Sequence, residues 1–385
     1  MRGYLMRTIR ADEYCKFVTD GTHDSPKQVD KGRKLITSKH LGRYGINFEG
    51  AKNISELDYQ KVISRSKVEQ WDILFSTIGN LYLERNHKIE YACKNMGIFQ
   101  LGGDESKAKW LYYYLQTPKA KEYIETSGRG TTQSYVPLAA LRALPVDVVD
   151  DFTRDKIIKI LWDIDEKILT NQQVNENLSD LVQSIYQAQF GDVSLVANKG
   201  ILSDICSYSK EKVAVSDLNV NIYFSTENML PGKAGSTEAT SLPATPQTTA
   251  CRKGDTLISN IRPYFKKIVY CEDMCGCSTD VLCFTPVQSQ YAAYLFSTLY
   301  TDKFFAFMVA GSKGTKMPRG DKQQIMTYPV VLPTENELKE FNAIAFPVLD
   351  QINSNKAENK RLSALRDALL PKLMSDEIDV SDIDI

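Results

Sequence analysis

The sequence predicts an α+β protein, a tandem pseudo-twofold duplication of two mixed α/β domains separated by two long antiparallel coiled-coil helices. Two observations predict this fold. The string NQQVNENL at Asn171 is matched by NKAENKRL at Asn355, 184 positions later. Around each string, apolar residues recur with alternating steps of four and three, which is the spacing of a coiled-coil seam. A chain of 385 residues has room for two or three domains.

The duplication extends beyond the two asparagine-rich strings. The same register, with a slip of one residue at its far end, aligns further segments: WLYYYL at Trp110 with YLFSTL at Tyr294, LPV at Leu144 with YPV at Tyr328, and Asp72 with Asp255. Chance would not hold one register over so much of the chain. Each half is therefore predicted to be one domain followed by one long helix.

The repeat sets the predicted boundaries. We expect a first domain at residues 1–150, a central helix at 151–190, a second domain at 191–333, a C-terminal helix at 334–374 and an acidic tail at 375–385.

Capping residues stand at the predicted helix ends. Asp150 suits the N-cap of the first helix, and Thr334 with Glu337 has the spacing of a capping box for the second. Gly191 suits the end of the first helix. Pro371 is expected to kink or stop the second helix, because proline lacks the backbone N–H that a helix interior needs.

Two asparagines interrupt the apolar seam of each helix: Asn171 and Asn175 in the first, Asn355 and Asn359 in the second. In an antiparallel pair the amide layers meet, and buried amides satisfy each other in one register only. We interpret these residues as the register of a rigid spacer about 43 Å long, at 1.5 Å per residue. The simpler alternative is that the amides lie on a wetter face of the helix.

Each predicted domain mixes strands and helices. ILFSTI and TLISNI alternate as strands do, whereas AKWLYYYLQTPKAKEYI and QYAAYLFSTLYTDKFFAFM have helical spacing. Aromatic residues on these helices, Tyr112, Tyr113, Tyr294 and Phe304 among them, are predicted to pack in the core rather than to stack on bases.

Composition describes an ordinary globular chain, with 43% hydrophobic and 25% charged residues. No apolar run approaches the ~20 residues of a membrane helix, and the N-terminal MRGYLMRTIRADEYC lacks the apolar core of a signal peptide. We therefore expect a cytoplasmic protein with no membrane partner. The eight cysteines are unevenly placed, which favours reduced thiols over a disulfide framework.

Catalytic motifs are scarce. GSKGTK lacks the P-loop pattern, no G-x-S-x-G elbow is present, and no segment suits an amino-methyltransferase or S-adenosylmethionine. His23, His40 and His87 all lie in the first copy, which excludes a duplicated histidine site. We predict no catalytic residue and no cofactor in this chain.

A zinc site is the alternative for the cysteines. Cys271, Cys275, Cys277 and Cys283 stand in CEDMCGCSTDVLC, and four thiolates can hold a structural zinc ion. Their spacing matches no common zinc knuckle, and only Cys277 has a counterpart, Cys93, in the first copy. We predict that these thiols pack between strands and bind no metal.

The net charge of the chain does not indicate a polyanionic partner, but local clusters of basic residues favour one. The net charge is −1, but five carboxylates in the last ten residues leave the rest of the chain at about +4. Lysines and arginines crowd residues 27–43, 252–267 and 313–319. Such clusters often only face water. Two basic domains held apart by a rigid spacer would nevertheless suit half-sites one DNA turn apart, about 34–36 Å.

Because the two copies have diverged in their domains, each domain should read a different half-site. The recognised sequence would then be bipartite and asymmetric.

Five segments resemble the specificity subunit of type I restriction-modification systems: FVTDGTHDSPK from Phe17, LITSKHL from Leu35, WDILFSTIGN from Trp71, GTTQSYVPLAALRALPV from Gly130 and NKRLSALRDALLPKLMSDEIDV from Asn359. The resemblance covers nearly the whole chain, although the second copy has no Asp-Gly-Thr-His loop. It implies two target-recognition domains, each binding half of a bipartite double-stranded DNA site, in a chain that is not itself an enzyme.

The same resemblance implies the partners. The two helices would bind methyltransferase (M) subunits, and restriction (R) subunits would join them. These partners would carry S-adenosylmethionine, ATP and Mg²⁺, methylate adenine at N6 and cleave unmodified sites. This chain would direct both reactions.

The loops of the two domains supply the predicted DNA contacts. Cations are expected to bind phosphates, which position the protein without specifying sequence: Lys27, Lys34, Lys39, Arg129, Lys253, Lys266, Lys313 and Lys316. Groups suited to base edges are Ser38, Gln133, Asn260, Arg262 and Arg319. His23, from the Asp-Gly-Thr-His loop, and Thr131 complete the set.

Three alternatives stay open. The first is the recognition portion of a fused methyltransferase-nuclease system, the second a coiled-coil interaction scaffold that binds no DNA, and the third a zinc-dependent enzyme. A scaffold would lack the steep salt dependence that counterion release gives to DNA-binding proteins. Metal analysis would reveal the zinc enzyme.

Overall fold

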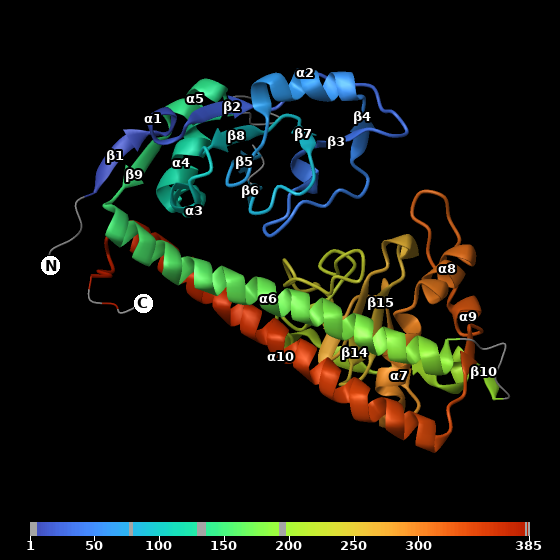
Figure 1. The fold of residues 1–385 in the computed structure, drawn as a ribbon. Coiled ribbons are helices and arrows are strands. Elements are labelled where there is room, and N and C mark those ends of the chain that lie inside the picture. Colours follow the sequence, from blue (N-terminus) through green and yellow to red (C-terminus); the bar gives the residue numbers. More distant parts are fainter. Residues whose placement is uncertain (1–5, 77–79, 129–135, 192–197, 382, 384–385) are drawn as a thin grey trace. The chain divides into compact units, whose positions relative to one another are not determined.

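The chain forms two compact units, which we describe one at a time. A computed structural model describes residues 6–76, 80–128, 136–191, 198–381 and 383 (Figure 1). The first unit consists of Met1–Thr170 with Glu358–Ile385, and the second of Asn171–Ala357. Two 40-residue helices, α6 (Asp151–Phe190) and α10 (Glu335–Met374), each contribute to both units.

The first unit contains three small sheets. A four-stranded antiparallel sheet has the order β2-β8-β5-β6, a second sheet has the order β4-β3-β7 with β3 and β7 parallel, and β1 pairs with β9. The elements are β1 (Arg7–Arg10), α1 (Ala11–Tyr14), β2 (Phe17–Asp20), β3 (Arg33–Ile36), η1 (Ser38–His40), β4 (Lys52–Ile54), α2 (Glu56–Ser66), β5 (Ile73–Phe75), β6 (Leu81–Leu83), β7 (Tyr91–Cys93), β8 (Gly97–Gln100), α3 (Glu105–Tyr114), α4 (Pro118–Ser127), α5 (Leu138–Ala143) and β9 (Pro145–Val148).

The second unit repeats the antiparallel sheet and the parallel strand pair of this plan, but its second sheet has four strands rather than three. Its antiparallel sheet has the order β11-β18-β15-β16, its second sheet the order β12-β14-β17-β13 with β13 and β17 parallel, and β10 pairs with β19. The elements are β10 (Lys199–Ile201), η2 (Leu202–Asp204), β11 (Cys206–Tyr208), β12 (Lys212–Ala214), η3 (Val215–Asp217), β13 (Tyr223–Phe224), β14 (Gln247–Cys251), β15 (Thr256–Ser259), η4 (Pro263–Phe265), β16 (Ile268–Tyr270), β17 (Cys275–Cys277), β18 (Val281–Pro286), η5 (Ser289–Tyr291), α7 (Ala292–Leu299), α8 (Asp302–Ala310), α9 (Lys322–Ile325) and β19 (Pro329–Val331).

Equivalent hydrogen bonds confirm the predicted duplication. In the first unit the Trp110 Nε1–H donates to the Asp147 carbonyl at 2.8 Å. In the second unit Tyr294, at the matching position, donates its hydroxyl to the Val331 carbonyl at 2.6 Å. Each contact joins the buried side chain of a helix to the last strand before the long helix.

Equivalent contacts also confirm the alignment of Asp72 with Asp255, which is shifted by one residue from the offset of 184. The Asp72 carboxylate accepts a hydrogen bond from the Glu69 backbone N–H at 2.8 Å, and Asp255 accepts one from the Arg252 N–H at 2.8 Å. Both carboxylates lie just before the central strand of the antiparallel sheet, where burial raises the pKa of each, that of Asp72 to about 7.

Each domain was predicted to contain one long segment with helical spacing. The structure divides each segment into two helices, α3 and α4 in the first unit and α7 and α8 in the second. The Thr117 side chain caps α4 and the Thr301 side chain caps α8, each by accepting a backbone N–H three residues later. A capping threonine ends the preceding helix because its own backbone is extended. As predicted, the aromatic residues of these helices are core, since Tyr112, Tyr113, Tyr294 and Phe304 are all buried.

The predicted caps of the long helices are confirmed. Asp150 accepts the Thr153 N–H at 3.0 Å, and Thr334 and Glu337 form the reciprocal capping box at 2.8 and 3.3 Å. These hydrogen bonds hold the pKa of Asp150 and of Glu337 below their usual values. The first helix ends at Phe190, as predicted.

Pro371 was expected to kink or stop the second helix, and it does not stop it. α10 runs on to Met374, and Leu370, Leu373 and Met374 are buried in the core of the first unit. Tertiary packing of the last turn therefore offsets the backbone hydrogen bond that proline removes.

The buried face of α6 differs from the predicted seam at one position in each unit. Ile157, Leu161 and Ile168 are buried in the first unit as expected, but Asp165 is buried in place of Ile164. In the second unit Tyr186 is buried in place of Ile185. The alternating spacing of four and three residues therefore predicts which side of the helix is buried, but not which of two adjacent residues lies in the core.

The helices pair antiparallel within each unit. In the second unit Asn175 lies against Asn355 and Tyr186 against Phe341. In the first unit Ile168 lies against Asn359 and Asp165 against Arg366. Residue numbers thus rise along α6 as they fall along α10.

The C-terminal segment is more than an acidic tail. Val380 is fully buried in the core of the first unit, and the Lys156 ammonium donates to the carbonyls of Val380 and Ser381 at 3.2 and 2.8 Å. The segment is therefore docked at residue 380. In the described ranges, no helix is long and apolar enough to cross a membrane.

Candidate nucleic-acid interface

The Asp-Gly-Thr-His loop of the first unit forms a polar cluster at the end of β2. The His23 ring lies 2.8 Å from Asp20 Oδ2 and 3.0 Å from Asn95 Oδ1, and its side chain is 53% exposed. Arg65 pairs with the other Asp20 oxygen at 3.3 Å. Gly21 is required here, because a Cβ would lie 2.4 Å from the Cys93 carbonyl oxygen. The loop therefore presents a half-exposed imidazole on a fixed backbone.

The basic residues predicted for the first unit differ in exposure. Lys27 and Lys39 are exposed, whereas Lys34 is half-buried and donates to the Ala51 carbonyl at 3.4 Å. Ser38 opens η1 and is half-buried. Three predicted residues lie outside the described residues: Arg129, Thr131 and Gln133.

His40 is a structural residue. Its Nδ1 accepts the Thr37 backbone N–H at 2.9 Å and caps the short helix η1. Burial lowers the pKa of His40, so the neutral imidazole is favoured. The second unit uses Asn228 in the same way, since its Oδ1 accepts the Ser225 N–H at 2.7 Å.

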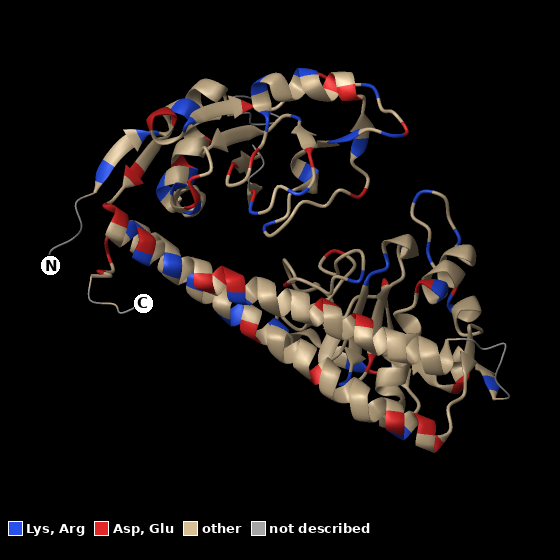
Figure 2. Cartoon of the chain, viewed as in Figure 1, with Lys and Arg blue, Asp and Glu red and all other residues tan. Residues whose placement is uncertain are grey.

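Three loops of the second unit meet at the end of β15. The Arg262 N–H donates to the Pro318 carbonyl at 2.8 Å, and the Lys233 N–H donates to the Lys266 carbonyl at 2.9 Å. The loop after α8 contains Lys and Arg residues, coloured blue in Figure 2. The structure thus brings together the predicted residues Arg262, Lys266, Lys313, Lys316 and Arg319 on adjoining loops.

Carboxylates already neutralise part of this cluster. Lys266 and Lys233 share Asp302, Lys313 pairs with Asp321 and Arg319 pairs with Asp280, at 2.5 to 3.3 Å. The two ammonium groups hold the pKa of Asp302 below its usual value, and Lys313 does the same for Asp321. Phosphate would have to compete with these carboxylates for the four cations.

Arg262 and Lys316 have no carboxylate partner among the residues that the structure describes. Lys316 is exposed, and so is Lys253 in the turn between β14 and β15. These side chains can reach a phosphate without breaking an ion pair.

The prediction that Asn260 reads a base edge needs correction. Its side chain is only 6% exposed, and its backbone bridges the Asp280 carbonyl and the Gly320 N–H. The amide has too little exposed surface to offer a base in this conformation. Asn260 instead ties two loops of the cluster together.

An exposed pair of aromatic residues in η4 was not predicted from the sequence. Tyr264 is 50% and Phe265 39% exposed, and their ring centroids lie 4.8 Å apart. The string IRPYFKK, with three cations around two aromatic residues, is the signal that could have identified it.

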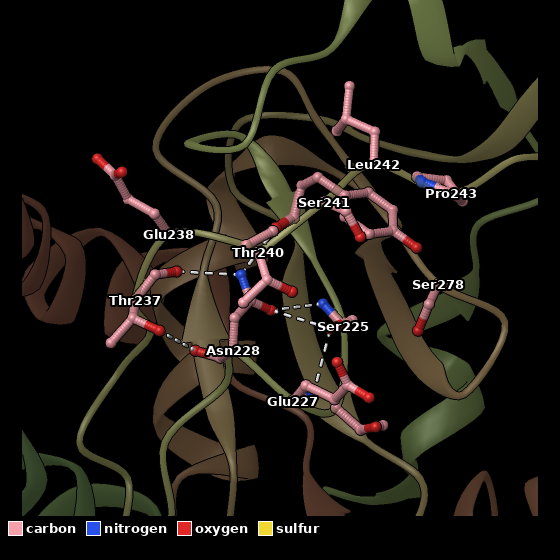
Figure 3. Close-up of a pocket in the computed structure, with 13 residues that line it drawn as sticks. Ser225, Glu227, Asn228, Thr237, Glu238, Thr240, Ser241, Leu242, Pro243 and Ser278 are labelled. Atoms are coloured by element: carbon pink, nitrogen blue, oxygen red, sulfur yellow. Dashed lines mark hydrogen bonds between the residues drawn. The ribbon is translucent and has the colours of Figure 1, made fainter.

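A polar pocket adjoins these loops (Figure 3). It is lined by segments 225–228 and 237–243 and by Ser278. Asn228 forms its base, donating to the carbonyls of Tyr223 at 2.9 Å and Thr237 at 3.0 Å. Lys267 joins the pocket to the aromatic turn by donating to the Thr226 carbonyl at 2.6 Å. Seven hydroxyl side chains on the lining, that of Tyr223 included, suit polar groups such as base edges or sugars.

The register asparagines contact one another and the neighbouring backbone. Asn355 Nδ2 donates to Asn175 Oδ1 at 2.8 Å, and Asn175 Nδ2 donates to the Ile352 carbonyl at 3.3 Å, all within the second unit. In the first unit Asn359 donates to the Ile168 carbonyl at 3.3 Å. Asn171 is buried at 3% exposure. The amides thus face the partner helix rather than a wetter face.

A buried ionic network in the first unit was not foreseen. The Arg366 guanidinium donates to Asp165 Oδ1 at 2.7 Å, and the Tyr44 and Tyr113 hydroxyls donate to the same carboxylate at 3.0 and 2.9 Å. Asp165 raises the pKa of Arg366 further above its usual value. This network joins the long helices to the loop that carries Tyr44.

The cysteines form a buried cluster rather than an evident metal centre. Cys271 and Cys275 lie 3.5 Å apart between sulfur atoms, and all eight cysteines are free and buried. Thiol hydrogen bonds from Cys251 and Cys271 lower the pKa of Cys275 below that of a free thiol. Within the described part of the chain, no group of three or more His, Cys, Asp or Glu is arranged to hold a metal ion.

Comparisons with known proteins agree with this architecture. Residues 27–179 match the family model described as Type I restriction modification DNA specificity domain. The chain is 24% identical over 170 residues to the Type I restriction enzyme HindI specificity subunit of Haemophilus influenzae, covering 42% of this chain and only about a third, 36%, of that protein. It is 20% identical to the MjaIX specificity subunit of Methanocaldococcus jannaschii, covering 90% of this chain and 87% of that protein.

A solved structure shares the fold. The crystal structure of the type I restriction-modification system S subunit from M. genitalium covers 97% of both chains with a TM-score of 0.52 and 16% identity. Residues 27–179 therefore carry a type I DNA specificity domain. The chain is thus similar to specificity subunits of type I restriction-modification systems, which confirms the resemblance seen in the sequence.

Proposed function

We propose that this chain is the DNA-recognition subunit of a type I restriction-modification complex and binds a bipartite, asymmetric site. Each domain would bind one half-site. The observation that carries the proposal is the duplication, which provides two domains of one plan that differ in their loops. Two similar domains with different loops are suited to two different half-sites on one duplex.

The loop chemistry supports DNA as the ligand. In the second unit, Arg262 and Lys316 are cations without a carboxylate partner among the described residues, beside a pocket lined with hydroxyl groups. In the first unit, His23 and the exposed Lys27 and Lys39 lie in loops of the recognition domain. Cations bind phosphates, and hydroxyl and amide groups read base edges.

The long helices are the proposed binding surface for methyltransferase subunits. Leu181 on α6 is 47% exposed and Leu365 on α10 is 49% exposed, and the two are equivalent in the repeat. An exposed leucine at the same place in both copies suits one kind of partner bound twice. Restriction subunits would then join the assembly.

We place the chemistry in those partners. They would bind S-adenosylmethionine, ATP and Mg²⁺, methylate adenine at N6 and cleave unmodified DNA in the cytoplasm, while this chain, which is not itself an enzyme, selects the site.

Single-molecule methylation sequencing of the host genome tests the proposal. We expect a gapped, two-part adenine motif in cells with the gene intact, and its loss when this gene alone is deleted. Re-expression of the gene should restore the same motif. A genome whose adenine methylation is identical with and without the gene, while the partner subunits are expressed, would refute the specificity role.

A further inference from the structure

Tyr264 and Phe265 form an exposed aromatic pair at the tip of the turn between β15 and β16. We propose that this pair stacks against a base in the half-site that the second domain binds, as a wedge next to phosphate-binding cations. This inference rests on the proposed function and adds the residues and the mode of contact.

The two rings are not part of the core. Tyr264 is 50% exposed and Phe265 39%, whereas Tyr294 and Phe304 in the same unit are fully buried. Exposed aromatic rings lack the stabilisation that burial of apolar surface gives. An exposed pair of adjacent aromatic side chains is therefore typical of a binding site.

The backbone holds the pair in one position. Arg262 and Lys266, which flank η4, adopt left-handed conformations with φ of 49° and 52°. Residues other than glycine adopt this region at a cost, so the surrounding structure must impose it. The turn is fixed by hydrogen bonds of Arg262 N–H with the Pro318 carbonyl and of Gly232 N–H with the Phe265 carbonyl, both 2.8 Å. Rings that are already fixed lose little conformational entropy on binding.

The charge around the pair identifies a polyanion as the occupant. Arg262 precedes the pair, and its Nε is buried without a hydrogen-bond partner in the described residues. Lys266 follows the pair, and the Lys267 ammonium lies 6.0 Å from the centre of the Phe265 ring. Lys266 already shares Asp302 with Lys233, and Lys267 donates to the Thr226 carbonyl, so Arg262 is the cation of this turn without a carboxylate partner among the described residues. DNA offers a phosphate to Arg262 and base faces to the rings, whereas an apolar protein surface would cover the guanidinium without a counter-charge.

The first copy lacks the pair. The string STIGN at Ser76 aligns with SNIRP at Ser259, and no pair of adjacent aromatic residues follows in the first copy before the next strand. The stacking contact is therefore specific to one half-site. This asymmetry makes the proposal testable within a single DNA duplex.

The experiment uses the complex of this chain with its methyltransferase subunits. Duplexes carry the motif found by methylation sequencing, with 2-aminopurine placed at one position at a time in both halves, because this base analogue changes fluorescence when its stacking changes. We expect a change at a position in one half-site only. Tyr264→Ala should abolish this change and weaken binding about tenfold or more.

Matched variants separate stacking from charge and from folding. Tyr264→Phe should keep both the fluorescence change and the affinity, because the ring remains. Met274→Ala removes a 59% exposed side chain from the same unit and should change neither. Tyr264→Ala should leave the salt dependence of binding unaltered, whereas Lys316→Ala, which removes an exposed cation, should lower its slope by about one.

Two results would overturn the inference. One is full affinity and an unchanged fluorescence signal for Tyr264→Ala. The other is an effect of Tyr264→Ala on binding of the methyltransferase subunits with DNA binding intact, which would make the pair a protein contact. Failure of the unmodified complex to prefer its own motif would instead overturn the proposed function itself.

Discussion

At the residue scale, the buried Asp165–Arg366 pair distinguishes the two copies. Both side chains are almost inaccessible in the first unit, and the carboxylate also accepts hydrogen bonds from Tyr44 and Tyr113. The equivalent positions of the repeat are Leu349 and Val182, both buried in the core of the second unit. One copy thus uses an ionic layer where the other uses an apolar layer.

We predict that Arg366→Leu lowers the free energy of unfolding by about 3 kcal/mol, because it leaves the buried Asp165 carboxylate with only the more distant guanidinium of Arg43, at 3.6 Å. Urea unfolding followed by circular dichroism measures this loss. The double variant Asp165→Leu/Arg366→Val copies the apolar layer of the second unit and should recover most of the stability. Recovery should be incomplete, because the Tyr44 and Tyr113 hydroxyls lose their acceptor.

If Arg366→Leu is as stable as the unmodified chain, the ion pair contributes nothing to the free energy of unfolding. A double variant no better than Arg366→Leu would show that the apolar layer of the second unit cannot replace it.

Residue-scale features were the hardest to predict. The Asp165 network depends on contacts between Tyr44, Tyr113 and Arg366, which lie far apart in the sequence, and the heptad pattern assigned the buried position to Ile164. The burial of Asn260 and the exposure of Tyr264 likewise depend on loops that meet only in the fold. Residue type alone placed Asn260 on DNA and missed the aromatic pair.

At the element scale, the two long helices were predicted well because their determinants are local. The capping box of Thr334 and Glu337 and the glycine after Phe190 are readable from the sequence. The end of α10 at Met374 also matches the predicted boundary, and burial of Leu373 and Met374 carries the helix past Pro371.

We predict that Asn355→Leu leaves the chain folded and at least as stable, but with a mixture of helix registers and oligomeric states. Asn355 donates to Asn175 and accepts from the Gln351 side chain, both at 2.8 Å, and leucine removes the contact that disfavours slipped pairings. Size-exclusion chromatography with light scattering measures the outcome.

Ser354→Leu is the matched control, because it places the same side chain at the neighbouring, exposed position. It should remain a single species. A single species for Asn355→Leu as well would contradict a register role for the asparagine layer.

At the scale of the whole molecule, the account depends on duplication followed by divergence. The four-stranded antiparallel sheets of the two units have corresponding orders, and α6 and α10 have the same length at the offset read from the sequence. This architecture was predictable because one register runs through the chain. The bases that each domain reads were not, because they depend on loop geometry, and part of the first domain's predicted site lies outside the described residues.

Exchange of the second domain tests the central claim most directly. Residues 198–331 would be replaced by the corresponding domain of another specificity subunit, and the adenine methylation motif would be sequenced in cells that express the partner subunits. If each domain reads its own half-site, one half of the motif changes while the other half and the gap between them stay the same. A change in both halves, or in neither, would contradict the account.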